Sequence, residues 1–313
     1  MRSIRPSQAE LNVESYTRAN WLCQNGRGEL AGGAWMWIGA RYLANKSMER
    51  AVVNGVELAY DLRGSGAPLV MIHGLQGDQT MFAGIAPAFL GKFRVLTFDQ
   101  RGSGLSQKPD HGYTMALIAD DTAALMEHLG MASAHVLGVS MGGMVAQELA
   151  LRHPSKVRSL ILGCTTPGGP KAVESDGSAF AAAYSTAEIS AEQRGTAFAA
   201  AVYSKEYLAR HPEAVTAAIE ARRNRPLDPL ALAHRTSALA GHDTYDRLPN
   251  ITCPALVITG KDDVLIPWEN SRILAERIPH AVLEVLEPAG HCFWLEKPQD
   301  SCEAILRFLE SLP

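Results

Sequence analysis

The residues best suited to chemistry lie in one short stretch, His135 to Met144, which contains the pattern Gly138-Val139-Ser140-Met141-Gly142. An apolar run of β-type residues precedes this G-x-S-x-G pattern, and apolar residues at helical spacing follow it. Such a strand–turn–helix context is typical of a nucleophile elbow, in which a serine hydroxyl is exposed at the edge of a sheet. The alternative is an ordinary strand-to-helix turn. We interpret Ser140 as a nucleophile because the rest of the chain contains candidates for the base and the acid that a nucleophilic serine requires.

The two glycines of the pattern have a steric explanation. The turn is so tight that side chains two positions to either side of the serine would collide, so Gly138 and Gly142 are required. The N–H of Met141 lies at the positive end of the predicted helix, where it can face a developing oxyanion.

A serine hydroxyl is a weak nucleophile near neutral pH and needs a base that a third group orients. His291 follows the last predicted strand and is the candidate base. Asp263 follows the preceding strand and is the candidate acid, with Asp262 as its neighbour and rival. Because the carboxyl ends of parallel strands share one edge of a sheet, we expect these side chains and Ser140 to meet there.

The elements that position these residues alternate between short apolar strands and helices. A hairpin is predicted at 51–60, with an Asn54-Gly55 type I′ turn. Further strands are predicted at 68–72, 93–98, 135–139, 157–162, 254–259 and 282–286. Helices are predicted around Met81, Ile85 and Phe89, over 115–129 and 141–150, from near Trp268, and over 299–309. This alternation predicts an α/β fold with a mostly parallel sheet and helices on both faces.

The alternation stops between residues 165 and 246, where alanine-rich helical patterns occur without a clear strand. We expect this segment to be a helical cap inserted over the carboxyl edge of the sheet, with the core formed by residues 48–164 and 247–313. Residues 1–47 differ from the rest and carry three of the five tryptophans. We interpret them as an N-terminal extension, either an accessory arm or sequence upstream of a natural start at Met48.

Composition limits the classes of partner. The chain is 47% apolar and 20% charged with a formal net charge of −4, which favours neither nucleic acid nor an anionic membrane as partner. The five cysteines are scattered and without C-x-x-C spacing, so we expect free thiols in a reducing, cytoplasmic compartment and no zinc site. We expect a small-molecule substrate, and the sequence leaves a homo-oligomer open.

From Met48 onward the chain resembles the α/β-hydrolase family, in its branch of small esterases, lactonases and C–C bond hydrolases. The motifs that carry the resemblance are His73-Gly74, Asp99-x-Arg101-Gly102-x-Gly104-x-Ser106, Gly138-x-Ser140-x-Gly142-Gly143, Gly260-x-x-Asp263-x-x-x-Pro267, and Gly290-His291 with Glu296-x-Pro298. Their order, with serine before aspartate and aspartate before histidine, is that of α/β-hydrolases. The N-terminal 47 residues have no counterpart in the family pattern.

The resemblance implies roles for further residues. Leu75, which follows His73-Gly74, would supply a second oxyanion N–H beside that of Met141. His73 would hold its own loop, and Arg101 would brace the loop after the fourth strand. A serine at position 140 excludes the family members that use aspartate at the elbow, and the HGGG loop of one lipase group is absent.

The resemblance implies a serine hydrolase that cleaves carboxylic esters of short to medium acyl chain, with Ser140, His291 and Asp263 as the catalytic triad. No metal or organic cofactor is implied. The alternatives are an enol-lactone or C–C bond hydrolase of aromatic degradation, and a ligand-sensing protein that keeps the hydrolase fold. Cofactor-free perhydrolases share the same motifs, and the sequence does not identify the natural substrate.

Overall fold

Eight strands form one sheet in the order β1-β2-β4-β3-β5-β6-β7-β8, and β2 alone runs antiparallel to the others. The computed structural model describes residues 48–175, 177–184, 189–224 and 228–313, so the predicted N-terminal extension lies outside the described residues. The strands are β1 (Glu49–Val53), β2 (Val56–Gly64), β3 (Ala67–Ile72), β4 (Phe93–Phe98), β5 (Ala134–Val139), β6 (Val157–Gly163), β7 (Ala255–Gly260) and β8 (Ala281–Leu286). The prediction of a mostly parallel sheet in an α/β fold is confirmed.

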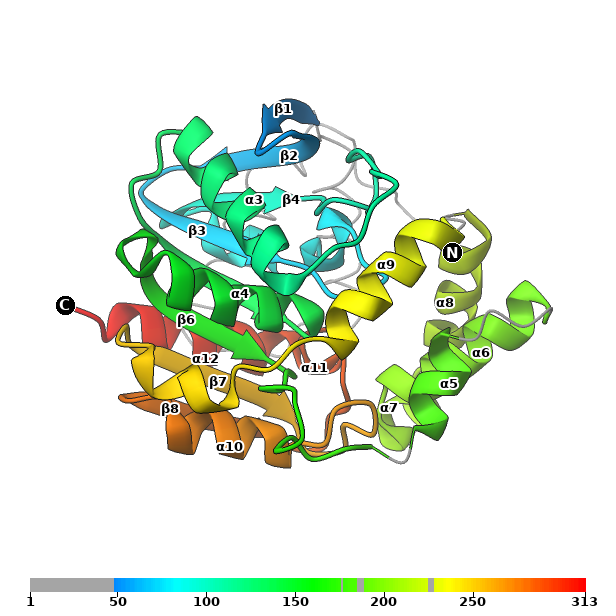
Figure 1. Ribbon diagram of the computed structural model, residues 1–313. Helices are drawn as coiled ribbons and strands as arrows, with labels where there is room; N and C mark the ends of the chain where they lie inside the picture. Colours follow the sequence, from blue (N-terminus) through cyan, green and yellow to red (C-terminus); the bar gives the residue numbers. More distant parts are fainter. Residues whose placement is uncertain (1–47, 176, 185–188, 225–227) are drawn as a thin grey trace, which may run out of the picture.

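Helices cover both faces of this sheet (Figure 1). The α-helices of the core are α3 (Met115–His128), α4 (Met141–Arg152), α10 (Glu269–Arg277), α11 (Phe293–Glu296) and α12 (Pro298–Glu310). Short 3₁₀ helices are η1 (Gln79–Phe82), η2 (Ala86–Phe89), η3 (Pro154–Lys156) and η4 (Tyr245–Asn250). One apolar cluster includes α3, α4 and α10, whereas a second, on the opposite face, includes η1, η2 and α12. No described helix is both long enough and apolar enough to cross a membrane.

Local sequence signals account for the ends of several elements. Asn54 and Gly55 have φ angles of 47° and 74°, as the predicted type I′ turn between β1 and β2 requires. Thr114 caps α3 by accepting a hydrogen bond from the Leu117 N–H.

The single helix predicted around Met81, Ile85 and Phe89 is wrong. Two 3₁₀ turns, η1 and η2, occupy this segment. Gly84 lies between them and Pro87 lies within the second. A proline has no N–H to donate and its ring clashes with the preceding turn, so Pro87 strongly disfavours a continuous α-helix through this segment.

Five α-helices precede η4 in the described part of the segment between β6 and β7. These cap helices are α5 (Ser178–Tyr184), α6 (Ala191–Val202), α7 (Lys205–Arg210), α8 (Glu213–Asn224) and α9 (Pro229–Ala240), and they lie beside the carboxyl edge of the sheet in Figure 1. The two ends of the segment meet in an isolated bridge between Gly168 and Asp243, and the Thr244 N–H donates to the Pro167 carbonyl at 2.9 Å. The division into core and cap at residues 165 and 246 stays a prediction.

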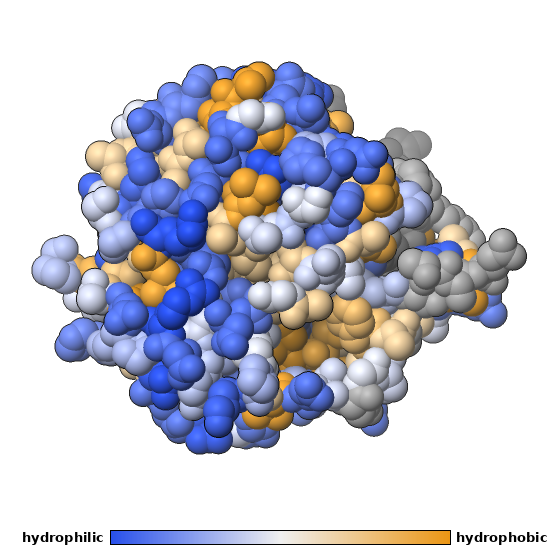
Figure 2. Space-filling view, viewed as in Figure 1, coloured by the Kyte–Doolittle hydropathy of each residue, from blue (hydrophilic) through white to orange (hydrophobic). Residues whose placement is uncertain are grey.

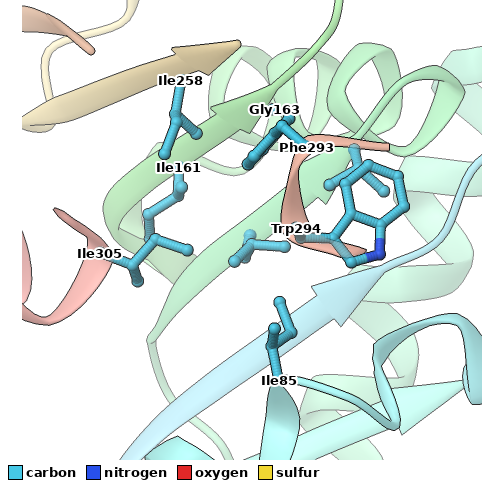
Figure 3. Close-up of a pocket in the computed structure, with 9 residues that line it drawn as sticks. Ile85, Ile161, Gly163, Ile258, Phe293, Trp294 and Ile305 are labelled. Atoms are coloured by element: carbon cyan, nitrogen blue, oxygen red, sulfur yellow. The ribbon is translucent and has the colours of Figure 1, made fainter. Parts of the chain in front are cut away.

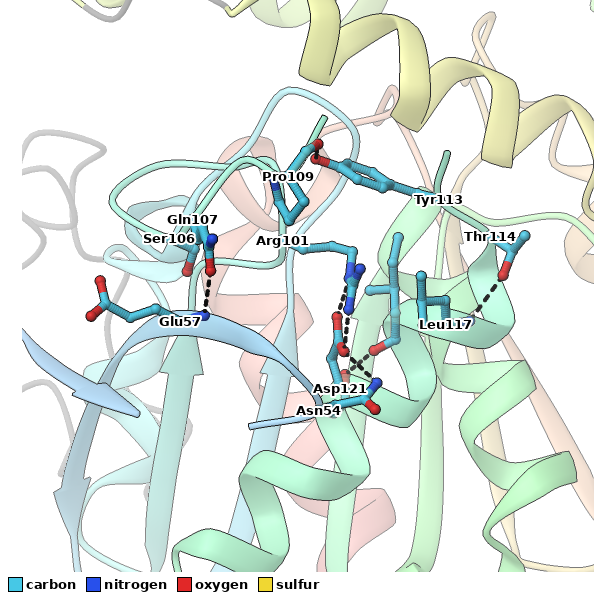
Figure 4. Close-up of polar contacts among 12 residues, drawn as sticks. Asn54, Glu57, Arg101, Ser106, Gln107, Pro109, Tyr113, Thr114, Leu117 and Asp121 are labelled. Carbon is cyan, nitrogen blue, oxygen red and sulfur yellow. Dashed lines mark hydrogen bonds and ion pairs between the residues drawn. The ribbon is translucent and has the colours of Figure 1, made fainter. Parts of the chain in front are cut away.

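A buried ion pair ties the loop after β4 to helix α3. The Arg101 guanidinium donates to both carboxylate oxygens of Asp121, and Asn54 Nδ2 donates to the same carboxylate at 2.8 Å (Figure 4). Both charged side chains are almost fully buried. Burial raises the pKa of the Asp121 carboxyl, and the hydrogen bonds from Arg101 and Asn54 oppose that rise. Loss of either charge would leave the other buried and unpaired.

We therefore expect Asp121→Asn to destabilise the fold strongly. Removing one partner of a buried ion pair typically costs about 3–5 kcal/mol in the free energy of unfolding. The adjacent Asp120 is the matched control, because its partners Arg152 and His153 are partly exposed and such pairs contribute about 1 kcal/mol or less. Urea unfolding of the two variants measures the difference. Equal losses of stability would contradict the role of the buried pair.

Candidate active site

The turn between β5 and α4 holds Ser140 in a strained backbone conformation, with φ 55° and ψ −124°. The surrounding backbone leaves no room for side chains at the flanking glycines. A Cβ atom on Gly138 would lie 2.2 Å from the Gly142 carbonyl oxygen, and one on Gly142 would lie 2.0 Å from the Ile72 carbonyl oxygen. Such contacts are far too short, which gives the structural reason for both glycines of the G-x-S-x-G pattern.

The backbone of Ser140 is held from both sides. Its N–H donates to the Gly163 carbonyl at 2.8 Å, and its carbonyl accepts a hydrogen bond from Thr165 Oγ1 at 2.8 Å. The residue is only 8% exposed. Within the described parts of the chain its hydroxyl makes no hydrogen bond, so Oγ is not engaged in holding the turn.

A buried carboxylate–histidine pair lies at the ends of β7 and β8. His291 Nδ1 and Asp263 Oδ2 are 2.7 Å apart, and both side chains are almost completely buried. The other carboxylate oxygen of Asp263 accepts the N–H groups of Leu265 and Ile266 at 2.9 Å each. Asp262 is exposed, and its N–H donates to the Ala289 carbonyl. Asp263 is therefore the carboxylate of this turn that contacts His291.

The charge of Asp263 changes the proton affinity of the imidazole. Burial lowers the pKa of His291, but the negative charge and hydrogen bond of Asp263, together with the neighbouring Cys164, outweigh burial and raise this pKa well above the usual histidine value. The imidazolium is thus stabilised where it would form after proton abstraction. The Nδ1–H···Asp263 bond also leaves Nε2 as the nitrogen that faces away from the carboxylate.

Cys164 is a neighbour of His291 that the sequence analysis did not single out for this role. Its Sγ lies 3.9 Å from His291 Nε2, and burial raises the pKa of its thiol, which keeps the sulfur neutral. No hydrogen bond between Ser140 Oγ and His291 Nε2 is present among the described residues. Hydrogen bonds of this kind are often long or absent before a substrate binds. The only sequence signal for Cys164 is its position as the first residue after β6.

Cys164, Asp263 and His291 form a cluster of residue types that bind metal ions. Asp263 bonds directly to His291 Nδ1 at 2.7 Å, which is too short for an ion between the two groups. Only Cys164 Sγ and His291 Nε2 remain to face an ion, which is one ligand fewer than the three protein ligands typical of catalytic zinc. The cluster therefore fits a hydrogen-bonded pair better than a metal centre.

The loop after β3 lies against Ser140. A Cβ atom on Gly74 would be 3.3 Å from the Cβ of Ser140, so Gly74 packs directly against the elbow, and Leu75 is the next residue of the same loop. Leu75 and Met141 are both buried. In the described chain neither backbone N–H donates a hydrogen bond. Because an oxyanion hole requires backbone N–H groups that are free to bind a substrate oxygen, both residues stay candidates for this role.

His73 holds the same loop, as the resemblance implies. Its Nε2 accepts the Gln100 N–H at 3.2 Å, which assigns the proton to Nδ1, and Nδ1 donates to the Gly74 carbonyl at 2.8 Å. Burial, with the nearby charge of Arg235, lowers the pKa of His73 to about 3. The imidazole is therefore neutral and has both nitrogens occupied.

The segment that carries His291 is anchored on two sides. Glu296 accepts the N–H groups of Gly290 and of Ser204, which is the N-cap residue of helix α7. Beyond His291, Phe293 and Trp294 pack into an apolar pocket against the sheet (Figure 3). The pocket is lined by Ile85, Leu137, Val139, Ile161, Gly163, Ile258, Phe293, Trp294 and Ile305. Since neither Ser140 nor His291 lines it, we interpret it as packing space behind the loop.

Comparison with known proteins places this site in context. A family model described as the alpha/beta hydrolase fold matches residues 67–298. RutD of Caulobacter sp. (strain K31), named as a proposed carbamate hydrolase, is 31% identical over 269 residues, covering 84% of this chain and 98% of its own. The enol-lactonase from Burkholderia xenovorans LB400 is 29% identical with a TM-score of 0.73, covering 84% of this chain and 100% of its own. A thermophilic esterase from Thermogutta terrifontis is 26% identical with a TM-score of 0.73, covering 85% and 99%.

The contact between Asp263 and His291 can be tested without reference to any reaction. Asp263→Asn should lower the pKa of His291, because burial then acts without the opposing negative charge. NMR spectra of the imidazole nitrogens across a pH series measure this shift. Asp262→Asn is the matched control and should leave the His291 pKa unchanged. A shift caused by the control variant would show that the turn has a different register.

Proposed function

The chain belongs to the α/β-hydrolase family, and from that premise we propose that it is a serine hydrolase which cleaves carboxylic esters of short to medium acyl chain. The observation that carries this proposal is the placement of an elbow serine and a buried His291–Asp263 pair at one edge of the sheet. The N–H groups of Leu75 and Met141 support it, because neither donates a hydrogen bond to another described residue. Each of these groups has a place in ester hydrolysis through an acyl-enzyme.

In the proposed mechanism, Ser140 Oγ attacks the ester carbonyl carbon while His291 Nε2 takes the hydroxyl proton. Asp263 keeps the imidazole in the required tautomer and stabilises its charged form. The N–H groups of Leu75 and Met141 hold the oxyanion of the tetrahedral intermediate. His291 then gives the proton to the departing alcohol, and a water molecule hydrolyses the acyl-enzyme by the same steps.

Two features favour an uncharged, apolar acyl group. Apolar residues gather in a hollow beside the cap helix α9, whereas most of the remaining visible surface is hydrophilic (Figure 2). Arg235, a buried cation next to the loop of Leu75, directs its nitrogens at backbone carbonyls. A guanidinium engaged in this way is poorly placed to bind the carboxylate of an anionic substrate. Both features favour simple esters over enol-lactones that carry a free carboxylate.

A ligand-sensing protein with the same fold is the rival interpretation from a different class. It would keep the geometry of the site but turn over slowly, and a ligand would raise its melting temperature. A panel of p-nitrophenyl esters, simple lactones, an aryl carbamate and a vinylogous diketone separates these functions. We expect the highest kcat/KM for esters of short to medium chain. Melting shifts without turnover would favour the sensor.

Replacement of the nucleophile gives the most direct test. Ser140→Ala should lower kcat for the best ester by roughly 10⁴ or more, as loss of a nucleophilic serine does in other hydrolases. A serine-directed phosphonate should label the wild-type protein at Ser140 and leave the folded variant unlabelled. Ser311→Ala, an exposed position near the C-terminus, is the control and should retain full labelling. Labelling at another serine would refute the assignment.

The two aspartates of the turn after β7 should differ in their effect on turnover. Asp263→Asn removes the group that orients His291, a change that lowered kcat about 10⁴-fold in a well-studied serine protease. Asp262→Asn alters an exposed side chain and should lower kcat by less than about tenfold. Both variants are first shown to be folded by circular dichroism. A larger loss for Asp262→Asn would contradict the proposed triad.

A further inference from the structure

Helix α9 of the cap contributes a buried arginine to the loop beside Ser140. Arg235 is 1% exposed, and three of its nitrogens donate to backbone carbonyls of the core. Nη2 donates to Gly74 O at 3.1 Å, and Nε donates to Leu75 O at 3.0 Å. Nη1 donates to Arg101 O, also at 3.1 Å. One side chain thus joins a cap helix to the loops after β3 and β4.

The first of these bonds acts on the peptide that carries the Leu75 N–H. In a trans peptide the carbonyl of one residue and the N–H of the next point in opposite directions. Because the Gly74 carbonyl points to Arg235, the Leu75 N–H points away from it. The same peptide lies against Ser140, since a Cβ atom on Gly74 would be 3.3 Å from the Ser140 Cβ. Rotation of this peptide would break the bond to Arg235 and turn the Leu75 N–H elsewhere.

The hydrogen bond from Arg235 Nε to the Leu75 carbonyl restricts rotation of the next peptide in the same way. With the Leu75 carbonyl also held by Arg235, neither peptide that flanks Leu75 can rotate freely. His73 Nδ1 and the Gly77 N–H also donate to the Gly74 carbonyl, at 2.8 and 3.2 Å. These two donors come from the loop itself, whereas Arg235 is 161 residues away in the chain and comes from the cap.

The charge of Arg235 has a consequence beyond geometry. Within the described residues no carboxylate forms an ion pair with this guanidinium, whose hydrogen-bond acceptors are three backbone carbonyls. Tyr113 and Asp99 favour its charged form without bonding to it. Burial lowers the Arg235 pKa to about 10, which still leaves the group charged at neutral pH. A positive charge on the carbonyl side polarises the peptide and makes its N–H a stronger donor. Burying an unpaired charge is costly for stability, which points to a use of the charge other than stability.

We propose that Arg235 is a positioning residue of the oxyanion hole: through the Gly74–Leu75 peptide it aims and polarises the Leu75 N–H, so that the hole is complete only when helix α9 is docked on the core. The inference rests on the proposed ester hydrolysis. It assigns to the cap a part in stabilising the transition state, in addition to any part in substrate size.

The test compares Arg235→Met, which removes charge and donors at similar length, with Arg235→Lys, which keeps the charge and loses the fork of donors. Arg235→Met should lower kcat by roughly 10²–10³, the typical effect of removing one oxyanion donor, and leave KM nearly unchanged. The kcat of Arg235→Lys should lie between the values for Arg235→Met and wild type. Arg210→Met is the matched control, because Arg210 is an exposed arginine of the cap helix α7, and its kcat should equal that of wild type.

A second readout follows the oxyanion hole directly. An alkylboronic acid forms a tetrahedral adduct with an active-site serine, and in wild type its binding should move the Leu75 amide proton downfield in ¹H–¹⁵N spectra. In Arg235→Met the boronic acid should bind more weakly by the same factor as the loss of kcat, with a smaller shift of the Leu75 amide. Unfolding curves establish that each variant is folded. If Arg235→Met does not fold, Arg235→Lys alone decides, since a loss of kcat at unchanged KM is still required of it.

The outcomes separate the two proposals. Wild-type kcat and boronic acid affinity in a folded Arg235 variant would overturn the role of Arg235 and leave the serine hydrolase proposal intact. A rise in KM without a change in kcat would also overturn it, because Arg235 would then serve substrate binding. If wild type hydrolyses no ester and forms no boronic acid adduct, the proposed function fails and this inference fails with it.

Discussion

The close approach of three backbone segments at the elbow is the constraint on which the site depends. Strand β5, helix α4 and the end of β3 meet where a Cβ atom on Gly138 or Gly142 would lie about 2 Å from a carbonyl oxygen. Ser140 remains at φ 55° because the surrounding structure holds both its N–H and its carbonyl. The same approach brings Gly74 against Ser140 and unites the elbow with the loop that follows β3.

The cap contacts both loops on which the proposed chemistry relies. At one side, Ser204, the N-cap residue of α7, donates to Glu296, and Glu296 also accepts the Gly290 N–H beside His291. At the other side, Arg235 of α9 holds the Gly74 and Leu75 carbonyls. The helices between β6 and β7 therefore supply hydrogen-bond donors to both of these loops. These helices are therefore part of the framework that holds the two loops.

The site contains two buried charges of opposite sign, on Asp263 and on Arg235. Asp263 is buried with three hydrogen bonds and raises the pKa of His291, so it favours the proton that the imidazole would receive. Arg235 is buried against carbonyls, with its positive charge on the far side of the peptide from the proposed oxyanion. Both charges sit where charge would develop in ester hydrolysis, one beside the imidazolium and the other behind the oxyanion donor. The proposed carbamate hydrolase and the enol-lactonase to which the chain is similar indicate that this fold also serves related acyl substrates.

Some features of the protein are determined by neighbouring residues and could be predicted from the sequence. The type I′ hairpin at Asn54-Gly55 and the elbow at Ser140 depend on short-range sterics and on glycine. The parallel sheet follows from the alternation of apolar strands and helices, and that alternation also places His291 and Asp263 at one edge. The single helix predicted around Ile85 is wrong, because the proline at position 87 outweighs the apolar periodicity of that segment.

Other features were decided only by the tertiary structure. The contact of Cys164 with His291 joins residues 127 apart in the chain, and the contact of Arg235 with Gly74 joins residues 161 apart. Neither the position of Cys164 after a strand nor that of Arg235 in an alanine-rich helix forms a sequence pattern that predicts such a partner. Their roles depend on how the cap docks on the sheet and on which carbonyls remain to be satisfied there. That docking results from packing between parts of the chain that are distant in sequence, so the spacing of neighbouring residues does not predict it.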